Sequence, residues 1–238
     1  MSRVTSGGKS GSGRTLIEAV YHNLKNDVIQ SRLAPSSKLL VESLRAKYEV
    51  SSSTMREALL LLVSDGLATS EGQRGFRVAP MSLDDLSGII RLRKTLESMA
   101  ITEAIKYGDD EWEANIVGAF HRMTLTEKRK PQSDNVNGGH YNDRNKEFHD
   151  ALVAASPSPW LHHFRTILFQ ASERYRIQFN LMAKPRAGAM KEHKAILDAT
   201  LARDAERASL LTVEHIDKSF RDVTKRFQGQ GCGDPLIE

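Results

Sequence analysis

The chain has 238 residues, a formal net charge of +4 and one cysteine, Cys232, and this length allows two modest domains with buried cores. One cysteine excludes a disulfide framework within the chain, and no apolar run approaches the roughly 20 residues of a membrane-spanning helix. The N-terminus also lacks the apolar core of a secretory signal, so we expect a cytoplasmic protein.

The positive charge is concentrated in the N-terminal third of the chain. Residues 1–80 hold 11 Lys and Arg against 7 Asp and Glu, whereas residues 81–238 hold 23 of each. A local excess of positive charge is what contact with nucleic-acid phosphates requires. The excess is modest, so charge alone does not establish DNA binding.

Residues 1–13 are rich in Gly and Ser and predict a flexible arm. The arm is either a disordered tail or a segment that touches DNA phosphates.

Three short helices are expected next. Residues 15–31 carry apolar side chains at helical spacing: Leu16, Ala19, Val20, Leu24 and Val28. Pro35 marks a turn, and the second helix is marked by a further apolar set: Leu39, Leu40, Leu44 and Tyr48. The third helix is expected over residues 51–65, with Ser51 as its N-cap and Gly66 as its stop.

A small β-hairpin should follow the third helix. Residues 67–70 and 76–79 predict two short strands, and Gly72 and Gly75 enclose the turn between them.

This N-terminal pattern resembles the winged helix-turn-helix of the GntR family of bacterial transcription regulators. The resemblance lies in the turn from Leu33 to Leu39, in Val50-Ser51 followed by Arg56-Glu57-Ala58-Leu59, and in the Gly-rich wing. It implies a DNA-binding domain over residues 14–80.

Within that resemblance, Arg56 is the leading candidate for a base or phosphate contact, because a guanidinium can bind guanine or phosphate with two hydrogen bonds. The hydroxyls beside it are Ser52, Ser53 and Thr54. Alternatively, Arg56 only pairs with Glu57 or Glu49 on the surface.

Arg74 and Gly75 resemble the family's wing tip, which enters the minor groove; the alternative is an ordinary exposed turn. The family often has Arg at the positions of Ser52 and Glu42. These two departures imply a different operator or weaker DNA binding.

From Ser82 to Phe227 the pattern is helical throughout, and Ser82 with Asp85 resembles a capping box. Six helices are expected: 82–107, 110–130, 139–155, 158–183, 187–202 and 204–228. The fold class is therefore mainly α, with an all-helical bundle over residues 81–228 and a flexible tail over 229–238.

Four polar residues of the bundle could form a metal site. Asn145 and His149 share a helix face, and His193 and His215 also have apolar neighbours. Three imidazoles and an amide oxygen can bind a divalent metal such as Zn²⁺ or Ni²⁺. The alternative is that these histidines are hydrogen-bonded core residues.

The bundle resembles the FCD effector domain of the FadR subfamily, through Asn145, Phe148-His149, Leu152 and Glu192-His193. The resemblance implies metal binding at Asn145, His149, His193 and His215. Asn145 stands where the family has an acidic ligand, which should weaken the metal. The resemblance also implies that Arg93 binds a carboxylate effector. The alternative is an ion pair between Arg93 and Glu97.

The combined pattern predicts a ligand-responsive regulator, of repressor type, that binds a palindromic operator as a homodimer. A small carboxylate in the helical domain would alter the spacing of the two DNA-binding domains. One alternative is that this domain only dimerises and its histidines are structural. Another is a hydrolase with a metal-activated water, which the fused DNA-binding motif argues against.

Overall fold

The computed structural model describes residues 15–128, 139–179 and 186–229. The chain forms two compact units. The N-terminal unit ends at Ala79, and the helical unit comprises the chain from Pro80 onward together with the short segment Ile29–Arg32. The expected arm, residues 1–13, lies outside the described residues, as does the tail beyond residue 229. No helix in the described part of the chain is both long and apolar enough to cross a membrane.

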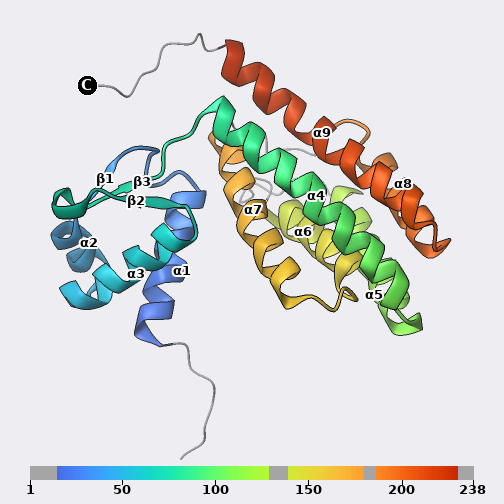
Figure 1. Cartoon of the computed structure of the whole chain (residues 1–238), viewed down its shortest axis with the longest axis horizontal. Helices are drawn as coiled ribbons and strands as arrows, with labels where there is room; N and C mark the ends of the chain where they lie inside the picture. The colour runs from blue at the N-terminus through green and yellow to red at the C-terminus, as the bar shows by residue number, and fades with distance from the viewer. Residues whose placement is uncertain (1–14, 129–138, 180–185, 230–238) are drawn as a thin grey trace, which may run out of the picture. The chain divides into compact units, whose positions relative to one another are not determined.

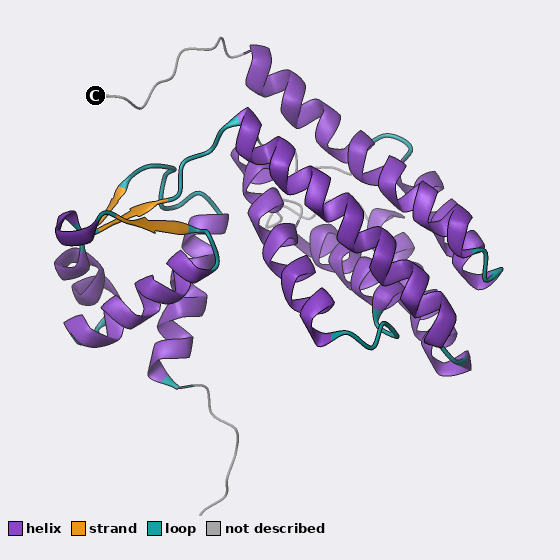
Figure 2. Cartoon of the chain, viewed as in Figure 1, coloured by secondary structure: helices purple, strands orange, loops and turns teal. Residues whose placement is uncertain are grey.

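The described part of the N-terminal unit contains three α-helices, a short 3₁₀ turn and a small sheet (Figure 1). Its helices are α1 (Leu16–Ile29), α2 (Val41–Tyr48) and α3 (Ser52–Ser64). The strands β1 (Lys38–Leu39), β2 (Ala68–Ser70) and β3 (Phe76–Val78) form an antiparallel sheet in the order β1-β3-β2 (Figure 2). The predicted winged helix-turn-helix is confirmed.

Strand β1 corrects the expectation that Leu39 belongs to the second helix. Leu39 pairs with Phe76 in the sheet and is buried. Helix α2 begins at Val41, with Leu40 as its N-cap. The two-residue strand brings the segment before α2 onto the wing and covers one edge of β3.

Helix α3 is fixed by its ends and by its apolar face. The Ser51 hydroxyl accepts a hydrogen bond from the Thr54 amide at 3.1 Å, as an N-cap should. Gly66 follows the helix with φ of +69°, a backbone conformation that glycine adopts at little cost. The inward side chains are fully buried: Met55, Ala58, Leu59 and Leu62.

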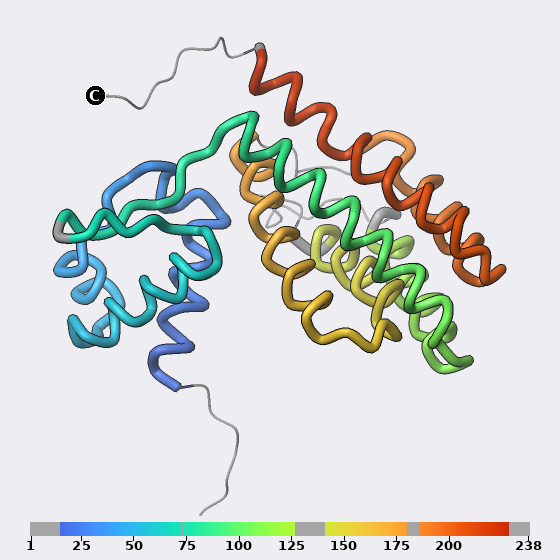
Figure 3. The backbone as a smooth tube through the Cα atoms, in the orientation of Figure 1, coloured from blue at the N-terminus to red at the C-terminus, as the bar shows by residue number. Residues whose placement is uncertain are grey.

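The helical unit contains six described helices, and the backbone trace follows them in chain order (Figure 3). They are α4 (Leu83–Tyr107), α5 (Asp110–Lys128), α6 (Gly139–Val153), α7 (Pro159–Gln178), α8 (Ala189–Leu201) and α9 (Ala205–Gly229). The predicted mainly-α class with an all-helical bundle is confirmed. Five of the six helices end within two residues of their predicted ends, whereas α7 ends at Gln178 with Phe179 as its C-cap and not at residue 183.

Helix α4 packs against both α7 and α9. Hydrogen bonds between α4 and α7 join Arg93 to Ser172 and Glu97 to Arg165, so the two helices run antiparallel. One apolar cluster lies among α4, α5, α6, α7, α8 and α9 and includes Ile101, Phe148 and Ile196. A second cluster, near the start of α4, includes Leu86, Tyr175 and Phe220.

The predicted capping box at the start of α4 is only half formed. The Ser82 hydroxyl accepts from the Asp85 amide at 3.0 Å, as predicted. The Ser82 amide, however, donates to the Tyr175 hydroxyl at 3.2 Å, and the Asp85 carboxylate accepts from that hydroxyl at 2.6 Å. Tyr175 of α7 therefore occupies the place that the Asp85 carboxylate takes in a complete capping box.

Candidate functional site

The start of α3 presents polar side chains to solvent. Ser53 and Arg56 are exposed, while Ser52 and Thr54 are half-buried. The Ser53 and Thr54 hydroxyls both lie within hydrogen-bond distance of the Ser51 hydroxyl, at 2.8 and 2.9 Å. Among the described residues Arg56 forms no ion pair, so neither Glu57 nor Glu49 holds its guanidinium.

Glu42 introduces a negative charge beside this surface. Its carboxylate accepts from Arg45 Nε at 2.5 Å and from the Ser52 hydroxyl at 3.2 Å. The Arg45 hydrogen bond is the main reason that the pKa of Glu42 lies below its ordinary value, and the charge of Arg56 adds to it. Glu42 is thus an anion among cations at the edge of α3.

The wing tip carries the other two predicted DNA contacts. Arg74 is exposed and ends a short 3₁₀ turn, Gly72–Arg74. Gly75 has φ of +94° and ψ of −142°, which favours glycine over any residue with a side chain. The backbone thus holds Arg74 at the outer end of the β2–β3 hairpin.

Three histidines meet in the helical unit, each from a different helix. His149 lies on α6, His193 on α8 and His215 on α9, and one ligand nitrogen of each lies within 4.8 Å of the others. His193 Nε2 and His215 Nε2 are 3.3 Å apart. Two nitrogens bound to one ion at about 2.0–2.1 Å are themselves roughly 3 Å apart, so this separation fits a shared metal.

The protonation state of the three histidines also favours metal binding. Burial is the largest cause that holds the pKa values of His149 and His193 well below their ordinary value, and it also lowers the pKa of His215. Their mutual repulsion lowers the pKa values of His149 and His193 further. The three rings are therefore neutral at pH 7, which is the form that binds metals.

Glu192 orients one of these rings. Its carboxylate lies 2.9 Å from His215 Nδ1, which leaves His215 Nε2 facing His193. Although burial opposes ionisation, hydrogen bonds from His215 and Arg186 lower the pKa of Glu192 to about 2. A carboxylate behind a ligand histidine fixes the ring and its tautomer, as in many metal sites.

Asn145 and the histidines border two adjoining cavities. The smaller, of about 30 Å³, is lined in part by Arg93, Asn145, His149 and His215. The larger, of about 310 Å³, shares Asn145 and His215 with the first and is also lined by His193. Asn145 and His149 share a cavity wall, as their spacing on one helix predicts.

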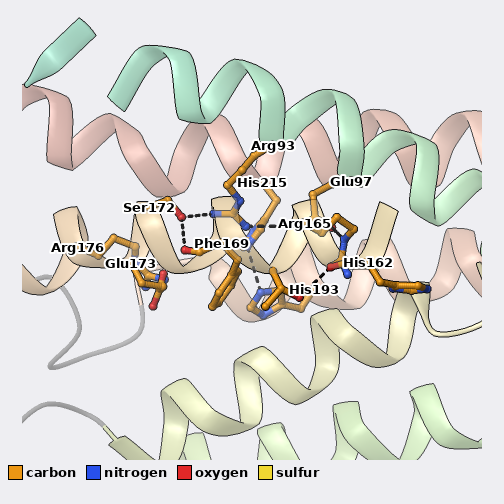
Figure 4. Close-up of polar contacts among 11 residues, drawn as sticks. Arg93, Glu97, His162, Arg165, Phe169, Ser172, Glu173, Arg176, His193 and His215 are labelled. Atoms are coloured by element: carbon orange, nitrogen blue, oxygen red, sulfur yellow. Dashed lines mark hydrogen bonds and ion pairs between the residues drawn. The ribbon is translucent and has the colours of Figure 1, made fainter. Parts of the chain in front are cut away.

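Arg93 is a buried cation with an incomplete set of partners. It donates to the Ser172 hydroxyl at 2.8 Å, but its nearest carboxylate, Glu97, is 3.7 Å away (Figure 4). Glu97 instead accepts from Arg165 Nε at 2.8 Å. The Arg93 Nε has no hydrogen-bond partner among the described residues. The ion pair with Glu97, the alternative to effector binding, is present but long, and Arg93 also lines the smaller cavity.

Sequence reasoning did not single out Arg165 and Ser172 on the α7 side of this site. Arg165 and Ser172 are buried polar residues of α7, and Arg176 lines both cavities. A signal was present in their spacing, because residues 165, 169, 172 and 176 follow helical intervals along one face. Figure 4 shows Arg165, Phe169 and Ser172 following one another along α7 below Arg93.

Comparisons with known proteins agree with this division of the chain. The family described as bacterial regulatory proteins of the gntR family matches residues 16–78, and the FCD domain matches residues 88–218, more than half of the chain. An uncharacterized HTH-type transcriptional regulator, BphR of Paraburkholderia xenovorans, is 40% identical over 90% of this chain and 87% of its own. The HTH-type transcriptional repressor GlaR of Escherichia coli is 34% identical over 82% of this chain and 90% of its own.

Solved structures share the fold. Escherichia coli McbR/YncC matches with a TM-score of 0.73 at 19% identity, over 90% of this chain and all of its own. A putative transcriptional regulator GntR from Rhodococcus sp. RHA1 matches with a TM-score of 0.70 at 17% identity, over 89% of this chain and 99% of its own. The curated relatives are named HTH-type transcriptional regulators, and the solved structures, at these identities, show that the fold is shared.

Proposed function

This chain belongs to the GntR family of DNA-binding transcriptional regulators, with an FCD domain, and from that premise we propose that it is a repressor controlled by a small organic acid. Two copies would bind a palindromic operator, because one winged helix contacts only a short half-site. Ser52, Ser53, Thr54 and Arg56 would contact the operator from α3, and Arg74 and Gly75 from the wing. The relative GlaR is named a repressor, which supports the direction of control.

The observation that carries the proposed control is the contact between a histidine cluster and a cavity that also holds a buried arginine. His149, His193 and His215, with Asn145 beside them, would hold a divalent metal such as Zn²⁺ or Ni²⁺. Bound there, the metal would supply a positive centre for a carboxylate. Arg93 would bind the same acid with the guanidinium N–H groups that its protein partners leave free.

The chemistry of the donor set fits such a metal. All three imidazoles are neutral and one is oriented by Glu192. Asn145 offers a neutral oxygen in place of a carboxylate, so the metal should bind more weakly than at a site with an acidic ligand. In the rival function, the helical unit only dimerises and the histidines are structural.

The test separates these two functions in one preparation. Operator DNA is selected from random oligonucleotides, and its affinity is measured at fixed salt with Zn²⁺ and a panel of small carboxylic acids. We expect at least one acid to weaken operator binding for the wild type and for Arg91→Gln, but not for Arg93→Gln. Arg91 is the matched control because it is an exposed arginine of the same helix. Selected DNA that no acid releases would favour the dimerisation-only function.

A further inference from the structure

Tyr175 links the wall of the smaller cavity to the beginning of α4. It is fully buried, at 0% exposure, and lies near the end of α7. Its hydroxyl accepts from the Ser82 amide at 3.2 Å and donates to the Asp85 carboxylate at 2.6 Å. One side chain thus holds both the N-cap and the first turn of α4.

The hydroxyl remains a donor under all ordinary conditions. Burial and the hydrogen bond to Asp85 raise the pKa of Tyr175. A neutral phenol can accept from an amide and donate to a carboxylate at once. These hydrogen bonds also satisfy polar groups at a helix end that would otherwise lack an internal partner.

The start of α4 follows the N-terminal unit almost directly. The Ala79 amide still bonds to the Leu67 carbonyl within that unit, at 3.0 Å. Only Pro80 and Met81 separate Ala79 from Ser82. A change in how Ser82 is held would therefore alter the path of the chain where it leaves the DNA-binding unit.

The other end of this link is the cavity. Residues one turn before and one residue after Tyr175 serve the site, since Ser172 holds Arg93 and Arg176 lines both cavities. Packing makes a second connection, because Ile216 and Phe220 line the smaller cavity and share an apolar cluster with Tyr175 and Leu86. Tyr175 is therefore connected to the cavity wall along α7 and through an apolar cluster that it shares with two α9 residues of that wall.

We propose that Tyr175 is a positioning residue that transmits the state of the cavity to the first turn of α4, and so to the chain entering from the DNA-binding unit. Its regulatory meaning rests on the proposed function, in which the cavity holds an acid. Allosteric control needs an element whose equilibrium both sites bias. The hydrogen bonds of Tyr175 with Ser82 and Asp85 are that element.

A mutational cycle read by hydrogen exchange tests this link without metal, acid or DNA. The full-length proteins are the wild type, Ser172→Ala, Tyr175→Phe and the double variant. Ser172→Ala perturbs the cavity by releasing Arg93, and Tyr175→Phe removes only the hydroxyl. The readout is the exchange rate of amides in a peptide covering residues 82–90.

We expect Ser172→Ala to speed exchange in this peptide by about threefold or more in the wild-type background, and to have little effect in the Tyr175→Phe background. Ser98→Ala replaces Tyr175→Phe in a control cycle, because Ser98 also joins α4 to another helix by a hydroxyl, at 2.6 Å from Ser209. The effect of Ser172→Ala should survive in that cycle.

Equal effects of Ser172→Ala in both backgrounds, or no effect on this peptide, would overturn the proposal. If the role of Tyr175 were purely structural, the effects of Ser172→Ala and Tyr175→Phe on the exchange rate would add in the double variant. Non-additivity is therefore the decisive readout. Because no ligand is used, failure of the proposed metal or acid function leaves this outcome unchanged. Conversely, failure of the link would leave acid-dependent DNA release to be explained by another route.

Discussion

The two units present their candidate functional groups in opposite settings. In the N-terminal unit, Arg56 and Arg74 are exposed above a separate apolar core. In the helical unit, Arg93 and His215 are each 8% exposed and His193 is 1% exposed, so the candidate site is itself part of the core. Function and stability should therefore be separable in the first unit and coupled in the second.

The largest expected effect is loss of metal on removal of one histidine. His193→Ala should reduce metal content from about one ion per chain to near zero, because the proposed site loses one of its three nitrogen ligands. The measurement is elemental analysis of protein purified without chelator and then supplied with Zn²⁺ or Ni²⁺.

The control for this measurement is His163→Ala, which removes an exposed histidine of α7 outside the cluster. Its metal content should equal that of the wild type. If the wild type takes up neither ion, the histidines are core polar groups and Arg93 becomes the main candidate for effector binding.

The next effect concerns the stability of the helical unit. Arg165→Met should lower the free energy of unfolding by about 3–5 kcal/mol, because the buried Glu97 carboxylate loses its 2.8 Å partner. Arg93 at 3.7 Å does not replace that hydrogen bond. Urea unfolding followed by circular dichroism measures the change.

Lys94→Met is the matched comparison, since it breaks an ion pair of α4 with Asp217 that is largely open to solvent. It should cost less than about 1 kcal/mol. Similar losses for the two variants would contradict the view that the Arg93–Glu97–Arg165 group is a buried and interdependent set.

Acidification should destabilise the metal-free helical unit before it affects the N-terminal unit. Burial lowers the pKa values of all three cluster histidines in the folded state, so the unfolded state binds more protons below about pH 6.5. Their contribution to stability is thus complete above that pH and is lost as the pH falls through and below it. Glu192, with a pKa of about 2, contributes a further loss only at lower pH.

Thermal unfolding between pH 7.5 and 5.5, after chelation of metals, measures this effect. A replacement that cannot ionise, His149→Gln, should reduce the dependence of the melting temperature on pH. An unchanged dependence would show that other groups dominate the titration of the unit in this range.

DNA binding should be separable from stability. Arg56→Ala is expected to weaken binding to a selected operator by about 1–3 kcal/mol per half-site while leaving thermal unfolding unchanged, because Arg56 is exposed and forms no ion pair among the described residues. Lys191→Ala removes the same charge from the exposed surface of α8 and controls for net charge. Equal losses in affinity would show that only overall charge matters.

The sequence predicts the long helices better than it predicts the short strand β1. The helices were predicted well because their apolar residues recur at helical spacing over many turns, as in α4. Strand β1 was missed because Lys38 and Leu39 are too few to show alternation. Its formation depends on pairing with β3, which is distant in sequence.

The candidate site shows the same limit. His149, His193 and His215 stand out because histidines among apolar residues are unusual, and the structure brings them within 4.8 Å. Arg165 and Ser172 read as ordinary polar residues, because their burial depends on how α7 packs against α4. The role of Tyr175 at the α4 cap depends on a contact 93 residues away in the chain, between its hydroxyl and Ser82.

The smallest effect tests whether the scaffold of the N-terminal unit can be weakened without touching its DNA-contacting groups. Ser51→Ala removes the N-cap acceptor of the Thr54 amide and should lower the stability of that unit by about 1 kcal/mol. It also frees the Ser53 and Thr54 hydroxyls, which now lie 2.8 and 2.9 Å from the Ser51 hydroxyl. If those hydroxyls contact phosphates, operator affinity should fall by less than the stability does, since the freed hydroxyls remain available to DNA.

Ser51→Asp keeps a capping acceptor but adds a negative charge beside the proposed phosphate contacts, so it should preserve stability and weaken binding. The opposite ranking of the two variants in unfolding and in DNA binding would establish that the cap supports α3 without itself contacting the operator.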